Sequence, residues 1–99
     1  MKVRLGPFVF YFLKTDNPSH HLGIVASRKT GCAVVRNRFR RRVRCLYALL
    51  QEKVKQSHDV VVIATSALAV ESRFAQIQMF FTKALEKLSY IENNGRAHI

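Results

Sequence analysis

The chain has 99 residues, enough for one domain with a modest hydrophobic core and too few for two. Its formal net charge of +11 and pI near 10.5 favour a polyanionic partner, with nucleic acid as the leading class. Residues 1–44 carry eleven Lys or Arg and one acid, Asp16, whereas residues 45–99 carry six and five. No apolar run is long enough to span a membrane, and Pro7 lies where a signal peptide would be helical, so a cytoplasmic protein is expected.

The first predicted strand is Phe8–Lys14, which is rich in aromatic and β-branched residues. Pro7 fits at its beginning, because the first position of a strand tolerates a residue without an N–H donor. Successive side chains of a strand point to opposite faces, so this strand presents two different surfaces. One face carries Phe8, Phe10 and Phe12, and the other carries Val9, Tyr11 and Leu13.

A polar loop follows at residues 15–20, where Asp, Asn, Pro and Ser supply typical turn chemistry. Residues 21–27 are predicted to form a second strand, antiparallel to the first across this loop. His20 and His21 are neighbours at its start. Adjacent strand residues point to opposite faces, so we do not expect these two histidines to share a metal ion.

Residues 28–31 form a basic turn into a long predicted helix, Ala33–Lys55, which Ser57–Asp59 should end. Wound at about 100° per residue, this helix gathers its apolar residues into one narrow stripe. The stripe contains Val35, Phe39, Val43, Leu46 and Leu50. The opposite face carries Arg38, Arg40, Arg41 and Arg44, with Arg36 and Arg42 at its borders.

The arginine-rich side of this helix favours binding to a polyanion. The stretch Gly31–Arg44 holds six arginines and no acidic residue, whereas solvated helix faces usually mix both signs. Guanidinium groups stay charged at neutral pH and pair bidentately with phosphate oxygens. Two alternatives stay open: a face that is only solvated, and a helix that lies on a membrane surface. Cys32 and Cys45 are expected to be free thiols, because two cysteines without histidine partners support neither a disulfide framework nor a zinc site.

The second half of the chain contains one more predicted strand and one more helix. Val60–Ala64 is apolar on both faces, as in a central strand, and should lie parallel to the second strand. Residues 65–70 form a connection without an assigned shape. An amphipathic helix is predicted over Glu71–Ser89 and ended by Asn93–Gly95, with residues 92–99 as a frayed tail. Its apolar stripe contains Phe74, Ile77, Phe81, Leu85 and Leu88.

The stretch from Leu22 to Arg44, LGIVASRKTGCAVVRNRFRRRVR, resembles the signature of the bacterial ribonuclease P protein component. In that signature a strand ends in Ser-Lys-Lys, a glycine follows, and a helix begins with Arg-Asn-Arg and further basic residues. The resemblance continues through Asp59–Ala64 as the family's last strand and Glu71–Leu88 as its last helix, so it covers nearly the whole chain. The sequence departs from the family's usual residues at Arg28, Cys32, Arg40 and Thr65.

The resemblance implies a single RNA-binding domain over residues 1–99 with an α+β fold. The expected architecture is a two-layer sandwich with a small mixed sheet, of the kind found in a ribosomal protein, and a left-handed β-α-β crossover. The family begins with a helix whose Phe residues wall a cleft for the tRNA leader. That N-terminal helix is expected to be missing here, because the chain begins almost directly at the first aromatic strand.

The implied role is that of the small partner of a catalytic RNA, which removes the 5′ leader from precursor tRNA using Mg²⁺ bound mainly by the RNA. We expect no catalytic residue, metal ligand or obligate protein partner for this chain, whose six carboxylates are scattered in the sequence. The residues implied to contact the catalytic RNA are Arg36, Asn37, Arg38, Arg40, Arg41 and Arg44. The residues implied to line the leader cleft are Val9, Tyr11, Ser27, Arg28 and Lys29.

Two other functions stay open at this point. A ribosomal or other structural RNA-binding protein of similar fold would bind RNA without taking part in tRNA processing. A nuclease acting alone would need an active site, and the scattered carboxylates do not indicate one. For Tyr11, ordinary core packing is the alternative to stacking on the leader.

Overall fold

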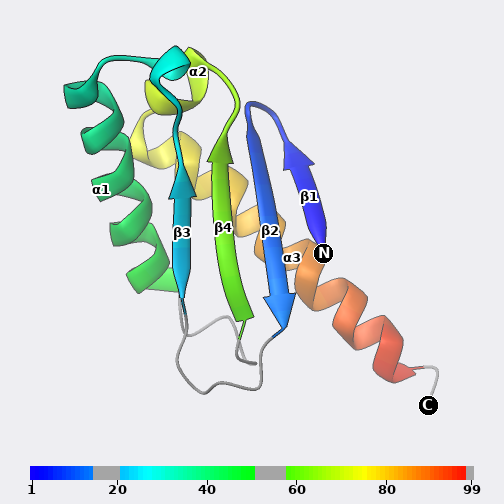
Figure 1. Ribbon diagram of the computed structural model, residues 1–99. Coiled ribbons are helices and arrows are strands. Elements are labelled where there is room, and N and C mark those ends of the chain that lie inside the picture. The colour runs from blue at the N-terminus through cyan, green and yellow to red at the C-terminus, as the bar shows by residue number, and fades with distance from the viewer. Residues whose placement is uncertain (15–20, 51–57, 98–99) are drawn as a thin grey trace.

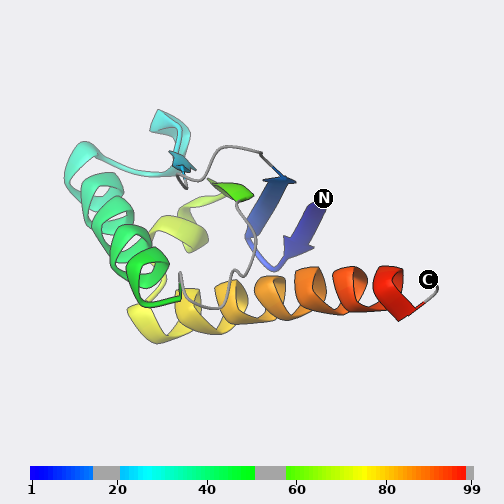
Figure 2. The same ribbon diagram turned by 90° about the horizontal axis from the view of Figure 1, so that it is seen from below.

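The computed structural model describes residues 1–14, 21–50 and 58–97, and their side chains as far as residue 88. A four-stranded sheet in the order β1-β2-β4-β3 forms one layer. Helices α1 and α3 lie on one face of this sheet, and over the described residues the other face is open (Figures 1 and 2). The elements are β1 (Lys2–Leu5), β2 (Phe8–Lys14), β3 (Leu22–Val25), the 3₁₀ helix η1 (Arg28–Thr30), α1 (Ala33–Leu50), β4 (His58–Ala64), α2 (Ala67–Val70) and α3 (Phe74–Ala97).

β1 and β2 form an antiparallel hairpin, of which the sequence analysis predicted only β2. All four residues of β1 pair with the first half of β2. Gly6 makes the turn with a φ of +56°, a left-handed conformation that glycine adopts without steric cost. Thr65, which follows β4, holds this turn in place, because its N and Oγ1 both donate to the carbonyl oxygen of Pro7, at 3.0 and 2.9 Å. A strand as short as β1 depends on such tertiary pairing, which the sequence does not display.

β4 occupies the centre of the sheet, as its apolar residues on both faces predicted. It pairs antiparallel with β2 and parallel with β3. β2 and β3 run in opposite directions, as expected, but the predicted pairing between them is wrong, because β4 lies between them. The central position suits β4, whose alternate residues are buried, whereas no residue of β3 is fully buried. His58 and Asp59, expected to end the preceding helix, are instead the first residues of β4.

β3 is shorter than predicted because the chain leaves the sheet after Val25. Ala26 is buried, and Ser27 has extended backbone angles at the start of η1. The carbonyl oxygen of Ser27 accepts two hydrogen bonds, from Thr30 N at 3.0 Å and from Thr30 Oγ1 at 2.6 Å. These bonds close the basic turn that leads into α1.

β3, α1 and β4 form the parallel strand-helix-strand unit that the sequence predicted. In Figure 1 both strands point upward with β4 to the right of β3, and Figure 2 shows α1 behind the sheet. A connection that passes behind the sheet and moves to the right is left-handed, the rare exception to the right-handed rule. This arrangement confirms the expected fold class, an α+β sandwich with a small mixed sheet and a left-handed crossover.

The core lies between the sheet and the two long helices. Phe8, Phe10 and Phe12 of β2 are all buried, as their shared face predicted. The ring of Phe39 in α1 stacks on Phe8 with a centroid separation of 6.0 Å, and the ring of Phe81 in α3 lies 5.4 Å from Phe10. Each such burial contributes about 1.5–3 kcal/mol to stability. The stripe of α1 is confirmed as core, with Phe39, Val43, Leu46 and Leu50 buried and Val35 half-buried.

The ends of the helices differ from the prediction. α1 begins at Ala33, as predicted, and its expected continuation over residues 51–55 lies outside the described residues. α3 begins at Phe74 rather than at Glu71 and continues to Ala97. The expected stop at Asn93–Gly95 is therefore wrong, because the helix passes through these residues, whereas the frayed tail expected over residues 92–99 stays a prediction. Within the described ranges, none of the helices is long and apolar enough to cross a membrane.

The connection between β4 and α3 contains the short helix α2, to which the sequence analysis assigned no shape. Ser72, just after α2, is buried and donates from Oγ to the carbonyl oxygen of Leu68 at 2.7 Å. Ile77, Phe81, Leu85 and Leu88 of α3 are buried as predicted, but Phe74 is 36% exposed. The later start of α3 explains this correction, because Phe74 is the first helical residue and lies at the edge of the core.

Candidate RNA-binding surface

The buried side of α1 determines where its polar side points. Phe39, Val43 and Leu46 are fully buried, so the opposite side of the helix faces solvent. We call this solvent-facing side the arginine face, and it comprises Asn37, Arg38, Arg40, Arg41 and Arg44. All of these residues are exposed except Arg40, which is half-buried. The helix contains no acidic residue, so its guanidinium groups have no carboxylate partner within α1.

A broad hollow of about 740 Å³ lies on the side of α1 that faces β3. Arg40 forms its wall towards the sheet, because one of its guanidinium nitrogens lies 3.5 Å from the carbonyl oxygen of Ala26 and the other 3.3 Å from Oδ1 of Asn37. The structure therefore places five of the six residues predicted to contact RNA on the arginine face, and four of these five line the hollow. The residues lining this hollow are Val34, Asn37, Arg40, Arg41 and Arg44.

The two border arginines of α1 are partly withdrawn from solvent. Arg42 donates from Nη1 to the carbonyl oxygen of Ser72 at 2.7 Å, which ties α1 to the chain just before α3. Arg36, the sixth predicted contact, is half-buried, and its Nε is buried without a hydrogen-bond partner among the residues that the structure describes. A buried donor without a partner costs about 1–3 kcal/mol. Arg36 thus offers RNA less of its guanidinium group than the arginine face does.

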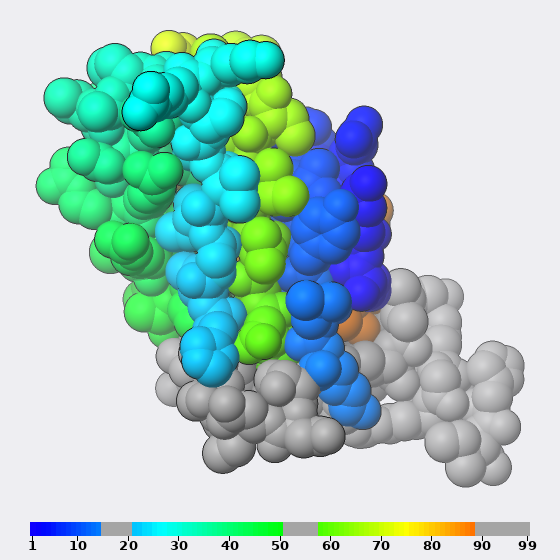
Figure 3. All heavy atoms as spheres, viewed as in Figure 1, coloured from blue at the N-terminus to red at the C-terminus, as the bar shows by residue number. Residues whose placement is uncertain are grey.

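The open face of the sheet carries the predicted leader residues Val9 and Tyr11. Figure 3 shows this face as a band from β1 to β3, with α1 along its border. Tyr11 is half-buried, so it is not the core residue that the alternative required, and the ammonium group of Lys2 lies 5.8 Å from its ring centroid. Val9 is only 4% exposed, between β1 and β4. Of the two, Tyr11 offers the larger surface to a ligand.

Ser27, Arg28 and Lys29, the remaining predicted leader residues, are all exposed. They lie where β3 passes into η1, so they extend the border of the open face towards the start of α1. Tyr11 lies on β2 and pairs with a residue of β4, so the whole of β4 lies between Tyr11 and β3. The structure therefore places these residues on one side of the molecule but does not bring Tyr11 into contact with the η1 cations.

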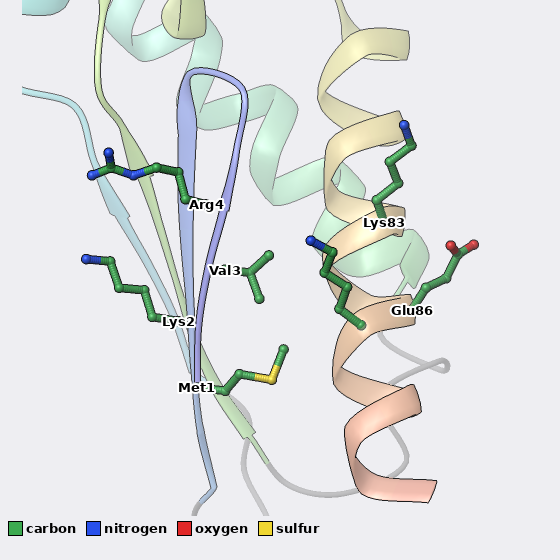
Figure 4. Close-up of a pocket in the computed structure, with 7 residues that line it drawn as sticks. Met1, Lys2, Val3, Arg4, Lys83 and Glu86 are labelled. Carbon is green, nitrogen blue, oxygen red and sulfur yellow. The ribbon is translucent and has the colours of Figure 1, made fainter. Parts of the chain in front are cut away.

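A second groove, of about 820 Å³, lies between β1 and α3, on the edge of the sheet opposite to α1. Figure 4 shows Met1 and Val3 pointing towards α3, and Lys2 and Arg4 pointing away from it. The groove is lined by Met1, Lys2, Val3, Arg4, Lys83, Glu86 and Lys87. Sequence reasoning missed it, because only the unpredicted strand β1 brings the start of the chain alongside α3.

The described His, Cys, Asp and Glu side chains are dispersed over the fold and do not gather in one place. No three or more of these described side chains are grouped so that they could hold a metal ion. His21 Nδ1 lies 3.2 Å from Oδ1 of Asp59 across the edge of the sheet. Burial, reinforced by the negative charge of Asp59, raises the pKa of Tyr47, whose buried hydroxyl has no hydrogen-bond partner among the described residues. Cys32 and Cys45 are both free and exposed.

Three features together define the class of this protein: the sheet with a left-handed crossover, the buried stripe of α1 and the arginine face. They are those of a small basic α+β protein suited to binding polyanions. A family model described as Ribonuclease P matches residues 1–89. The Ribonuclease P protein component of Geobacillus thermodenitrificans is 34% identical over 90 residues, which cover 90% of this chain and 74% of the relative. That of Acidothermus cellulolyticus is 35% identical over 92 residues, covering 90% and 76%.

Solved structures agree with the sequence comparison. The RNase P protein from Thermotoga maritima has a TM-score of 0.77 at 27% identity, covering 88% of this chain and 82% of that one. A Staphylococcus aureus RNase P protein has a TM-score of 0.74 at 28% identity, covering 90% and 80%. The chain belongs to the bacterial ribonuclease P protein component family. Members are part of an endoribonuclease complex of tRNA 5′ processing, which implies an RNA subunit as partner.

Proposed function

We propose that this chain binds the catalytic RNA of ribonuclease P through the arginine face and the 5′ leader of precursor tRNA through the open face of the sheet. The observation that carries the proposal is the arginine face itself. Its guanidinium groups occupy one side of a helix whose other side is fully buried, and the helix provides no carboxylate to neutralise them. Such a surface gains affinity for RNA by releasing the counterions that phosphates otherwise retain.

The open face suits a single strand for a different reason. Tyr11 presents part of an aromatic ring with a lysine beside it, and exposed Arg28 and Lys29 stand at the border towards α1. Aromatic stacking combined with nearby cations binds single-stranded RNA without strong sequence preference. This is the property that a protein must have if it accepts the varied leaders of different precursor tRNAs.

Phosphodiester hydrolysis belongs, in this proposal, to the RNA and the Mg²⁺ ions that it holds. The described carboxylates support this division of labour, because Asp59, Glu71 and Glu86 lie on different parts of the fold. The protein contributes by adding affinity for the substrate and by neutralising phosphates near the bound metal ions. A cytoplasmic location and the absence of an obligate protein partner stay predictions.

The experiment is reconstitution of the holoenzyme with a bacterial ribonuclease P RNA at low Mg²⁺ concentration. We expect this chain to restore cleavage of precursor tRNA at its 5′ end, and the chain without RNA to cleave nothing. Restored RNA binding without restored cleavage would instead favour a structural RNA-binding protein. Cleavage by the chain alone would identify an independent nuclease.

The leader assignment is tested separately with Tyr11→Ala. Loss of a stacking platform costs about 1–3 kcal/mol per base, so the holoenzyme should bind precursor tRNA more weakly. Mature tRNA has no leader, and its affinity should not change, nor should the affinity of the protein for the catalytic RNA alone. If Tyr11→Ala weakens binding of precursor and mature tRNA equally, or of neither, the open face does not bind the leader.

A further inference from the structure

A small hollow of about 280 Å³ lies on the other flank of α1, where this helix meets the start of α3. Arg41 lines both this hollow and the broad hollow beside β3, so it stands on the ridge between them. The small hollow belongs to neither the open face of the sheet nor the β1–α3 groove. Its lining residues are Arg38, Arg41, Arg42, Cys45 and Phe74.

Phe74 is the unusual member of this set. The sequence pattern predicts it as core, and the next residues of the same stripe, Ile77 and Phe81, are buried. Phe74 nevertheless keeps 36% of its surface exposed, next to the guanidinium-bearing side of α1. A single exposed apolar residue is ordinary on a protein surface. An aromatic ring that forms one wall of a hollow otherwise lined by three arginines and a cysteine has more specific binding properties.

The walls of the small hollow are held in place. Arg42 is fixed by its 2.7 Å hydrogen bond to the carbonyl oxygen of Ser72, and Ser72 is fixed in turn by its hydrogen bond to Leu68. Arginine stems are apolar and only their ends carry charge. The lining of the hollow is mainly apolar although three arginines contribute to it, and it contains no acidic side chain among the described residues.

We propose that this hollow binds one unpaired nucleobase of the catalytic RNA, stacked on Phe74, while Arg38 and Arg41 contact the adjoining phosphates. The inference rests on the proposed function and adds a base-binding site to the phosphate-binding arginine face. Aromatic rings stack on bases and arginines pair with phosphates, so the hollow matches both parts of a nucleotide. Ligand pockets usually measure about 300–1,000 Å³, so a hollow of this size suits one planar ring rather than a longer ligand.

The first test measures the affinity of Phe74 variants for a bacterial ribonuclease P RNA. Phe74→Ala should weaken binding by roughly 5- to 150-fold. Phe74→Tyr should retain affinity, because its ring still stacks, whereas Phe74→Leu should behave like Phe74→Ala. Thermal unfolding of each variant checks that the fold is intact. Equal affinity of all three variants and the unsubstituted chain would overturn the proposal.

Salt dependence separates a base contact from a charge contact. Arg38→Ala should reduce the slope of log K against log salt concentration, by about 0.7–0.9 if one phosphate contact is lost. Phe74→Ala should lower affinity at every salt concentration and leave the slope unchanged. A reduced slope in Phe74→Ala would show that the ring acts only by positioning the arginines, and would contradict stacking.

The chain contains no tryptophan, which permits a direct probe. Phe74→Trp places the only tryptophan of that variant in the hollow, and Met79→Trp places one at a position on α3 that is 46% exposed and outside the hollow. Binding of the RNA should quench the indole fluorescence of the Phe74→Trp variant and leave that of the Met79→Trp variant almost unchanged. Equal responses of the two variants, or no response of Phe74→Trp, would refute base binding here.

The same experiments distinguish this inference from the function on which it rests. Arg44→Ala alters the broad hollow and leaves the small one intact. If Arg44→Ala weakens RNA binding but the Phe74 variants do not, the proposed function stands and the nucleobase site is wrong. If none of these substitutions affects RNA binding, the arginine face itself is not the RNA-binding surface.

Discussion

Phe39 joins the arginine-rich helix α1 to the sheet, and Phe39→Ala tests whether this packing positions the arginine face. The side chain is fully buried and its ring stacks on Phe8 at 6.0 Å with an interplanar angle of 13°. Phe→Ala substitutions in cores cost about 3–5 kcal/mol. An aromatic pair adds about 0.5–1.5 kcal/mol beyond burial, so we expect the upper part of this range. Domains of this kind have a total stability of about 5–15 kcal/mol.

Urea unfolding followed by circular dichroism measures this loss. Val34→Ala is the matched control, because Val34 lies on the same helix but is 74% exposed. The control should change the free energy of unfolding by no more than about 0.5 kcal/mol. If Phe39→Ala destabilises the chain by less than about 1 kcal/mol, or no more than the control does, α1 is not packed on the sheet as described. The outward direction of its arginines would then have no structural basis.

Three further predictions concern the turn, a buried tyrosine and the arginine face. Gly6→Ala should destabilise the fold by more than about 1 kcal/mol. The φ of Gly6 is +56°, and the new Cβ would lie 2.8 Å from the ring of Phe80. Unchanged urea unfolding of this variant would contradict the described conformation of the turn. The pKa of Tyr47 is raised above its ordinary value of 10.0 in the folded chain. Just above pH 10 the unfolded chain therefore loses the hydroxyl proton of Tyr47 while the folded chain keeps it, so the free energy of unfolding should fall as the pH rises through this range. Tyr47→Phe should reduce this alkaline loss of stability. Arg44→Ala should reduce the salt slope of RNA binding by up to about 0.9 with urea unfolding unchanged.

The sequence predicted the structure best where the local spacing of hydrophobic residues matches the burial of their side chains in the fold. Alternation along β2 predicted its buried Phe face, and the spacing of Phe39, Val43 and Leu46 predicted the stripe of α1. β4 was recognised as central because it is apolar on both faces. In each of these elements the spacing of hydrophobic residues alone indicated the type of element and its buried face. Contacts with the rest of the fold did not change that outcome.

The predictions from the sequence were wrong where contacts between residues far apart in the chain decide the structure and the local residue pattern does not. β1 is stabilised by pairing with β2 and by Thr65, a residue far away in the sequence. The place of β3 next to β4 follows from the crossover and not from the loop that joins it to β2. Asn93 and Gly95 are poor helix formers, yet α3 continues through them. Phe74 has the period of a core residue but lies at the start of its helix, beyond the cover of the sheet.

The positively charged outer side of α1 was predictable, because the sequence shows charge of one sign in a helix without acidic residues. The sequence did not predict that α1 has two different flanks, because the difference depends on which element packs against each side of the helix. β3 borders one flank through the contact of Arg40 with Ala26, and the start of α3 borders the other through Arg42 and Ser72. The open face was predicted only in part, since burial of Val9 requires β1 beside it.

The central position of β4 also affects how this chain folds. β2 and β3 are made early in synthesis, but both pair with β4, which follows the whole of α1. Non-local pairing of this kind slows folding, because the chain must close a long loop before β2 and β3 can pair with β4. Until β4 has been synthesised, β2 lacks its central sheet partner, and the stripe of α1 has no complete surface to cover it. Cooperative folding of the arginine-rich helix α1 must therefore wait for β4, a strand that carries none of the predicted RNA contacts.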